Sequence, residues 1–246
     1  MATTLFLKIT MSDIYILSIE TATPLCSVSL AKNGVTLHEI VGEEANMHAS
    51  SLTLFIESLL QETSLKMNDL SAVAVSKGPG SYTGLRIGVS AAKGLCYALD
   101  IPMIANNTLD AMYRGFMAGS PQVSDKTLLL PMIDARRQEV YTQVLTGEGQ
   151  VIESTKALIV DAGSFDSYLA DGHHLIFFGS GADKFDEQFK ENASIQVALG
   201  FDAKASFQDA LAYEKFQAGD FEDVAYFEPY YLKDFMVTAP KKSPLL

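Results

Sequence analysis

Residues 76–86 constrain the fold of this chain more than any other segment, and they read Ser-Lys-Gly-Pro-Gly-Ser-Tyr-Thr-Gly-Leu-Arg. An apolar, β-branched run at residues 72–75 precedes them, and a run of apolar and small residues at 85–99 follows. This order predicts a strand, a glycine loop and a helix. The first N–H groups of such a helix are unpaired and attract anions. The segment is therefore either a phosphate site or a tight turn without a ligand.

The residues of this glycine loop that could carry a function are Gly78, Pro79, Gly80, Ser81, Thr83 and Gly84. Their spacing meets neither the Walker loop nor the dinucleotide-binding fingerprint. Glycine permits positive φ angles and lets other groups approach the backbone closely. We therefore expect the glycines to serve backbone geometry or close packing more than phosphate binding. We expect Ser81 to be a helix-start hydroxyl and not a nucleophile, because no G-x-S-x-G elbow is present.

The composition of the chain limits the cellular compartments and the classes of ligand that can be expected. The 246 residues carry a formal net charge of −12, and an acidic surface repels the phosphates of nucleic acids. Independent nucleic-acid binding is therefore not expected, although a local basic spot can still touch RNA. Cys26 and Cys96 are the only cysteines, which indicates a reduced, cytoplasmic environment. No apolar run approaches the ~20 residues that cross a bilayer, so no membrane segment is expected.

The elements expected along the first half have the order of a ribonuclease-H-like fold. Strands are expected at residues 14–20, 25–31, 35–41, 72–76 and 103–106. Helices are expected at residues 46–61, 85–99 and 108–117. Asn33-Gly34 is a strong hairpin signal, and Thr108 is the expected cap of the third helix. We therefore predict an α/β fold with mixed sheets flanked by helices.

A linker is expected at residues 119–122, because strands begin again after it. The second half suggests a lobe related to the first, although no sequence repeat proves a duplication. Four units are expected: an N-terminal extension at 1–12, a first lobe at 13–118, a smaller second lobe at 123–205, and a C-terminal helix and tail at 206–246 that return to the first lobe.

The chain offers few residues for catalysis or metal binding. No two histidines have i, i+4 spacing, and no CxxC motif is present, so no metal site is predicted. Glu20 ends the first expected strand and is either a metal-directing acid or a solvated turn acid. Asp134, Arg136 and Arg137 form a polar hairpin, which is either a charged tip or a contact to a partner or anion. We predict no catalytic residue.

Two helices contain unusually little charge for such an acidic chain. On a wheel of about 100° per residue, the first helix turns Met47, Ser51, Leu54 and Ser58 away from its apolar core arc. The helix after the glycine loop is almost entirely apolar or small, and its exceptions fall on one narrow stripe of the same spacing: Arg86, Ser90, Lys93 and Tyr97. The repeat of both stripes is that of a helix-packing seam. They either face water or form a partner interface.

Five segments together resemble the bacterial TsaB (YeaZ) family. They are residues 16–22, His48 with the helix after it, residues 77–88, residues 134–141 and residues 229–232. The resemblance is close over residues 14–145 and thin over 150–225. It implies an actin-like, two-lobed ATPase fold and a role in making threonylcarbamoyladenosine at position 37 of tRNAs that read ANN codons.

The resemblance also implies a division of labour. Family members are non-catalytic, pair through their first-lobe helices with the catalytic paralogue TsaD, and are joined by the ATPase TsaE. The paralogue has an H-x-x-x-H metal pair, whereas here Leu52 stands four residues after His48. The resemblance thus implies a subunit without cofactor or metal that meets tRNA only through the complex, with a homodimer possible in isolation. The alternative is a free-standing nucleotide-binding enzyme of the actin-like class; a metallopeptidase has little support.

Overall fold

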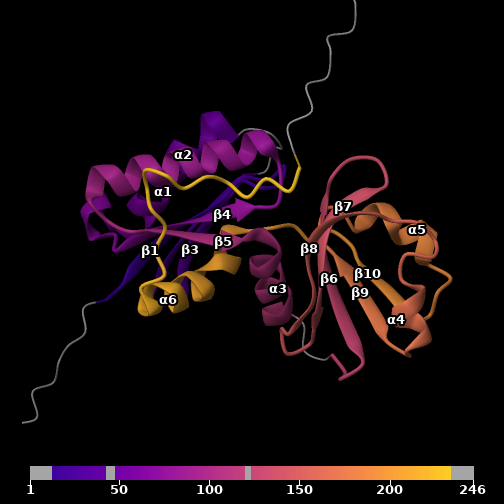
Figure 1. The fold of residues 1–246 in the computed structure, drawn as a ribbon. Helices are drawn as coiled ribbons and strands as arrows, with labels where there is room; N and C mark the ends of the chain where they lie inside the picture. Colours follow the sequence, from indigo (N-terminus) through magenta and orange to yellow (C-terminus); the bar gives the residue numbers. More distant parts are fainter. Residues whose placement is uncertain (1–12, 43–47, 120–122, 234–246) are drawn as a thin grey trace, which may run out of the picture.

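The computed structural model describes residues 13–42, 48–119 and 123–233, with the side chains of 48–50 excepted. Two α/β lobes lie side by side, each built on one sheet (Figure 1). The expected extension at 1–12 and the proposed interface residue Met47 lie outside the described residues.

The first lobe is built on a mixed sheet with the strand order β3-β2-β1-β4-β5. Its strands are β1 (Tyr15–Glu20), β2 (Ser27–Lys32), β3 (Val35–Val41), β4 (Ala72–Gly78) and β5 (Met103–Asn107). The first three are antiparallel, whereas β4 pairs with β1 and β5 with β4 in parallel. Asn33 and Gly34 both have positive φ angles between β2 and β3, which confirms the Asn-Gly turn.

Helices cover both faces of this sheet because alternate strand residues point to opposite sides. Leu17 and Ile19 of β1 share a core with α1 (His48–Thr63) and α2 (Tyr82–Leu99). Ile16 instead packs with Ala212 of α6 (Asp209–Ala218) on the other face. A short 3-10 helix, η1 (Met67–Asp69), leads from α1 into β4.

The second lobe repeats the topology of the first. Its strands are β6 (Thr127–Asp134), β7 (Glu139–Thr146), β8 (Val151–Ile159), β9 (His174–Phe178) and β10 (Ile195–Ala198), in the order β10-β9-β6-β7-β8. The pairs β6–β7 and β7–β8 are antiparallel, and β9 and β10 extend the sheet in parallel. The short helices of this lobe are α4 (Asp166–Ala170), η2 (Asp183–Phe185) and α5 (Asp186–Phe189).

The helix α3 (Thr108–Gly119) joins the lobes. Leu109 and Met112 pack with Leu129, Ile133 and Phe178 of the second sheet. The expected cap, Thr108, is instead the first residue of this helix. The preceding residue Asn107 takes the capping role, because its Oδ1 accepts a hydrogen bond from the N–H of Leu109 at 2.9 Å.

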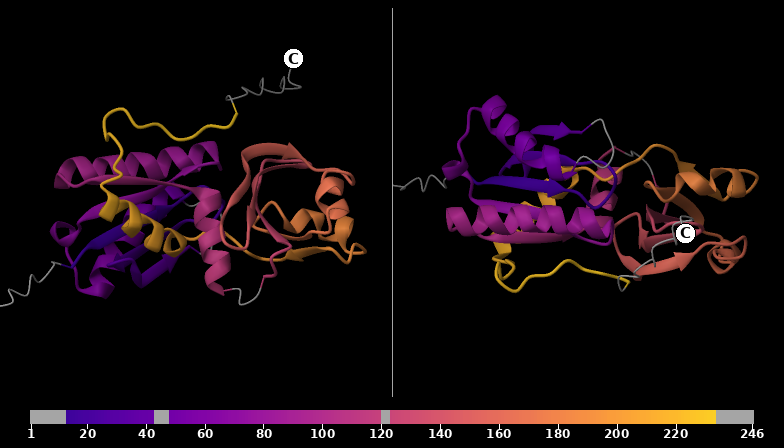
Figure 2. Two further views of the ribbon diagram at one scale, coloured as in Figure 1. Left: turned by 60° about the horizontal axis from the view of Figure 1, so that its bottom comes forward. Right: turned by 90° about the horizontal axis from the view of Figure 1, so that it is seen from above.

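The chain returns to the first lobe through η3 (Ala205–Gln208) and α6, and then continues as an extended segment. We call residues 220–233 the C-terminal strap. Figure 2 shows the strap running alongside α2 towards the second lobe. The predicted α/β class with two mixed sheets flanked by helices is confirmed. The residue limits proposed for the four units stay a prediction.

Candidate functional site

The glycine loop lies against the turn that follows β1. The N–H of Ser81 donates to the carbonyl of Ala22 at 2.7 Å, and the hydroxyl of Thr21 donates to the carbonyl of Gly84 at 2.8 Å. Ser81 is the N-cap of α2, and its Oγ accepts from the N–H of Gly84 at 3.2 Å. The expectation of a helix-start hydroxyl at Ser81 is therefore confirmed.

The glycines of the loop are required by close backbone contact more than by unusual backbone angles. A Cβ added at Gly84 would lie 2.0 Å from the carbonyl oxygen of Thr21, and one at Gly80 2.4 Å from that of Ala22. Of the loop glycines, only Gly78 has a positive φ angle, +115°, and its Cβ would lie 2.7 Å from the carbonyl oxygen of Tyr230. The geometry supports the close-packing interpretation.

The C-terminal strap fastens this loop to α2. The N–H of Tyr230 donates to the carbonyl of Lys77 at 2.7 Å. The Arg86 guanidinium lies over the ring of Tyr82, 4.1 Å from its centroid, and its Nε donates to the Tyr231 hydroxyl at 3.2 Å. These contacts tie a segment far along the chain to the start of α2.

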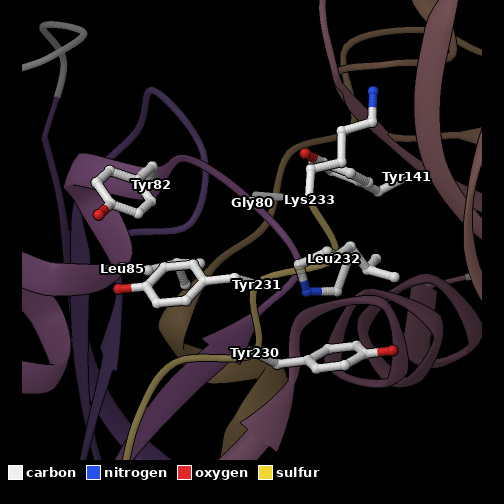
Figure 3. A pocket seen from close by; sticks show the side chains of 9 residues that line it. Gly80, Tyr82, Leu85, Tyr141, Tyr230, Tyr231, Leu232 and Lys233 are labelled. Carbon is white, nitrogen blue, oxygen red and sulfur yellow. The ribbon is translucent and has the colours of Figure 1, made fainter. Parts of the chain in front are cut away.

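The strap also reaches the second lobe. Lys233 forms an ion pair with Glu139, the first residue of β7. Figure 3 shows Lys233 near Tyr141 of β7 and Gly80 of the loop, and the three residues line one small cavity. The glycine loop, the strap and the second-lobe hairpin therefore meet at the junction of the lobes.

The expected partner face is only partly exposed. Leu54 on α1 and Tyr97 on α2 expose 60% and 86% of their surface, and Ser90 is also exposed. Ser58 is half-buried, and so is Lys93, whose Nζ donates to the carbonyl of Ala225 in the strap at 3.2 Å. The face therefore has an exposed apolar centre on each helix, and the strap borders it on the α2 side.

Ser51 departs from the expectation that it faces outward, because it is only 8% exposed. On the helical wheel it lies about 40° from Phe55, which packs against the core. The buried arc of α1 is therefore wider on this side than the apolar residues alone indicate.

Two acids are buried in the first lobe, and the first of them is Glu20, the last residue of β1. Glu20 is 0% exposed, so the solvated-acid interpretation is wrong. Its carboxylate accepts hydrogen bonds from the N–H of Ala22 at 2.7 Å and from the hydroxyl of Ser76. Gln208 Nε2 completes the set at 3.4 Å. Desolvation raises the pKa of Glu20 to about 7, against the lowering effect of the hydrogen bonds from Ser76 and from the backbone N–H of Ala22.

A second buried carboxylate, Asp209 at the start of α6, is held by three hydroxyls. Ser18, Ser29 and Thr36 donate to it at 2.7, 2.8 and 2.6 Å. Desolvation raises its pKa to about 6, again in opposition to the hydrogen bonds. The Asp209 carboxylate anchors α6 to β1, β2 and β3, so its role is structural.

We expect Glu20→Gln to flatten the pH dependence of stability. The folded-state pKa of Glu20 lies above its ordinary value of 4.5, so the folded chain holds a proton that the unfolded chain has lost between about pH 4.5 and 7. The free energy of unfolding therefore falls as the pH rises through this window, by on the order of 3 kcal/mol for this group. Urea unfolding of both proteins from pH 4.5 to 8 measures the slope, and an unchanged slope would contradict the assignment. Asp209, whose pKa is also raised, accounts for the pH dependence of the free energy of unfolding that remains in Glu20→Gln.

The polar hairpin of Asp134, Arg136 and Arg137 lies at the tip between β6 and β7. The Asp134 carboxylate accepts from Lys184 Nζ at 2.5 Å and from the N–H of Arg136 at 3.1 Å. Both arginines are exposed. Both interpretations of this hairpin, a charged tip and a contact to a partner or anion, stay predictions.

Sequence reasoning missed several residues of this region. Gln208 lies 189 positions from Ile19, Asp209 lies 173 positions from Thr36, and Lys233 lies 94 positions from Glu139. A buried Gln-Asp pair at the start of an expected helix is a weak signal by itself. Tyr230 and Tyr231 give a stronger sequence signal. Two aromatic residues in an irregular tail indicate that the tail packs against the rest of the fold.

Neither a metal cluster nor a membrane helix is found in the part of the chain that the structure describes. No group of three or more His, Cys, Asp and Glu side chains is placed to hold a metal ion there. None of the helices in the described ranges is long and apolar enough to cross a membrane.

Comparison with known proteins connects this architecture to one family. A family model described as TsaD, tRNA N6-adenosine threonylcarbamoyltransferase, matches residues 36–207. The protein TsaB of Bacillus subtilis, named for tRNA threonylcarbamoyladenosine biosynthesis, is 34% identical over 56% of this chain and 58% of its own length. Its namesake from Escherichia coli is 38% identical over 51% of this chain and 52% of its own length. The alignments thus span little more than half of these relatives.

Solved structures share the fold over a longer stretch. YeaZ from Pseudomonas aeruginosa superposes with a TM-score of 0.71 at 24% identity and covers 89% of this chain and 100% of its own. A second Pseudomonas aeruginosa structure, described as similar to peptidase YeaZ, gives a TM-score of 0.73 at 24% identity over the same shares. Both lobes therefore have the YeaZ arrangement. The chain belongs to the TsaD-type threonylcarbamoyltransferase family and, within it, to the TsaB (YeaZ) proteins.

Proposed function

We propose that this chain is a non-catalytic, cytoplasmic subunit of the enzyme complex that forms threonylcarbamoyladenosine at position 37 of tRNAs reading ANN codons. It would pair with a TsaD-type catalytic paralogue, which transfers the threonylcarbamoyl group from threonylcarbamoyl-adenylate to N6 of the adenosine. The observation that carries the proposal is the exposed face of α1 and α2, where Leu54 and Tyr97 stand in water on a chain otherwise rich in acids. Exposed apolar side chains on two helices in contact with each other fit a binding site for another protein.

Two features of the first lobe support the non-catalytic role. In the glycine loop, the backbone of Thr21 and Ala22 lies directly against Gly84 and Gly80, which supports a packing role for these glycines. Leu52, four residues after His48 on α1, is buried in the core and supplies no second metal ligand. A TsaE-type ATPase as a further partner, and a homodimer of the isolated chain, remain expectations from the family.

Reconstitution tests the proposal directly. A purified TsaD-type paralogue, tRNA and threonylcarbamoyl-adenylate should give little threonylcarbamoyladenosine without this chain and at least tenfold more with it, measured by mass spectrometry of digested tRNA. A preparation with the chain but without the paralogue should give none. Transfer by the chain alone would refute the non-catalytic role, and tight ATP binding by the chain alone would favour the free-standing enzyme instead.

A further inference from the structure

The tip of the β6–β7 hairpin holds two arginines in a backbone conformation that favours glycine. Arg136 and Arg137 have φ angles of +74° and +52°, and neither position holds a glycine or an asparagine. Side chains other than these rarely occupy such angles, because the Cβ crowds the backbone. The presence of arginine at two successive strained positions indicates that the side chains themselves are used.

The acids beside these arginines are already neutralised by lysines. Lys184 Nζ contacts the carboxylate of Asp134 at 2.5 Å and the carbonyl of Glu139 at 2.7 Å. The Glu139 carboxylate pairs with Lys233 of the strap. Neither Arg136 nor Arg137 makes a salt bridge to any residue in the described ranges. The tip therefore presents two positive charges that its own carboxylates do not cancel.

The other two arginines of the chain are engaged elsewhere. Arg86 stacks on Tyr82 and donates to Tyr231, and Arg114 pairs with Glu214 at 2.9 Å. The tip is also well anchored, because the N–H of Ala135 donates to the carbonyl of Glu139 at 3.0 Å. An exposed pair of arginines on a fixed hairpin, in a chain with a net charge of −12, is a local site for an anion.

We infer that the arginine tip, Arg136 and Arg137, binds the phosphodiester backbone of the RNA on which the complex acts; this inference rests on the proposed function. The guanidinium fork matches phosphate oxygens, and an RNA backbone offers successive phosphates to two neighbouring arginines. The surrounding acidic surface keeps the affinity of this contact low in the isolated chain. The tip therefore adds to RNA binding by the assembled complex, in which the partner supplies the remaining contacts.

The test compares variants in the heterodimer with the TsaD-type paralogue, using fluorescence anisotropy of a labelled tRNA transcript. R136G/R137G removes both charges and suits the positive φ angles, so the fold is kept. We expect its dissociation constant to rise about tenfold at 100 mM salt. The slope of log K against log[salt] should shrink by about 1.5, as for two lost phosphate contacts. R136K/R137K should keep the slope, and R114A, which breaks the ion pair between α3 and α6, should change neither quantity.

The outcomes separate this inference from the proposed function. Unchanged RNA affinity and salt slope in R136G/R137G would overturn the inference. Loss of paralogue binding in that variant, with its RNA contacts unaltered, would do so too and would assign the tip to an acidic protein segment. If the unmodified chain does not co-elute with the paralogue, the proposed function fails. The RNA titration is then made with the chain alone at 50 mM salt, and the same comparison of variants decides.

Discussion

Leu54→Asp combined with Ser90→Glu should separate this chain from the TsaD-type paralogue. Both residues are exposed, so the folded chain should tolerate the charges. In an interface the two carboxylates would be buried without partners, and each such charge costs several kcal/mol. We expect the dissociation constant to rise by roughly a thousandfold or more. Size-exclusion chromatography of the mixture at micromolar concentration, followed by titration calorimetry, measures this change.

The second lobe supplies a matched control for that variant. Leu199 is 61% exposed and Ser167 is also exposed, so Leu199→Asp with Ser167→Glu adds the same charges away from α1 and α2. This control should bind the paralogue as the unmodified chain does. Co-elution of the first double variant with the paralogue would place the interface elsewhere and refute our interpretation of both helices. The proposed interface should bury more than about 1,000 Å² in total, which is the usual floor for a specific contact.

The first lobe could be predicted well because its signals are local. The β2–β3 hairpin follows from Asn33-Gly34, and α2 follows from the glycine loop and the apolar run after it. Each of these elements is specified by residues within a few positions of one another. In contrast, α4, α5 and β10 have four or five residues each and show too little of a period to be recognised.

The parts of the site that escaped prediction depend on distant residues. Glu20 is buried because Ser76 and Gln208 provide hydrogen bonds from 56 and 188 positions away, and without them a buried acid would be too costly. The sequence pattern around Glu20 contains no sign of either donor. The uncompensated charge of the arginine tip likewise depends on Lys184 and Lys233, which only the folded chain brings beside the acids.

Gly84→Ala should destabilise the chain severely, whereas Gly94→Ala in the same helix should not. The new Cβ at residue 84 would lie 2.0 Å from the Thr21 carbonyl oxygen, a backbone atom that cannot rotate away. Relief requires α2 to move from the β1–β2 turn, which breaks the hydrogen bond from the Thr21 hydroxyl to the Gly84 carbonyl. We expect the free energy of unfolding to fall by about 3 kcal/mol or more, as for severe overpacking.

Gly94→Ala is the control that separates the steric effect at residue 84 from the general preference of helices for alanine over glycine. It is exposed on α2, and a Cβ there would meet nothing within 4 Å. Gly94→Ala should therefore raise the free energy of unfolding by about 1 kcal/mol through helix propensity alone. Denaturant unfolding of both variants measures the two effects on one helix. If Gly84→Ala folds with normal stability and instead abolishes nucleotide binding by the chain, the loop is a phosphate site. The free-standing nucleotide-binding enzyme would then be the better account. The close-packing interpretation would fail, because it requires that the backbone at Thr21 cannot move to make room for the new Cβ.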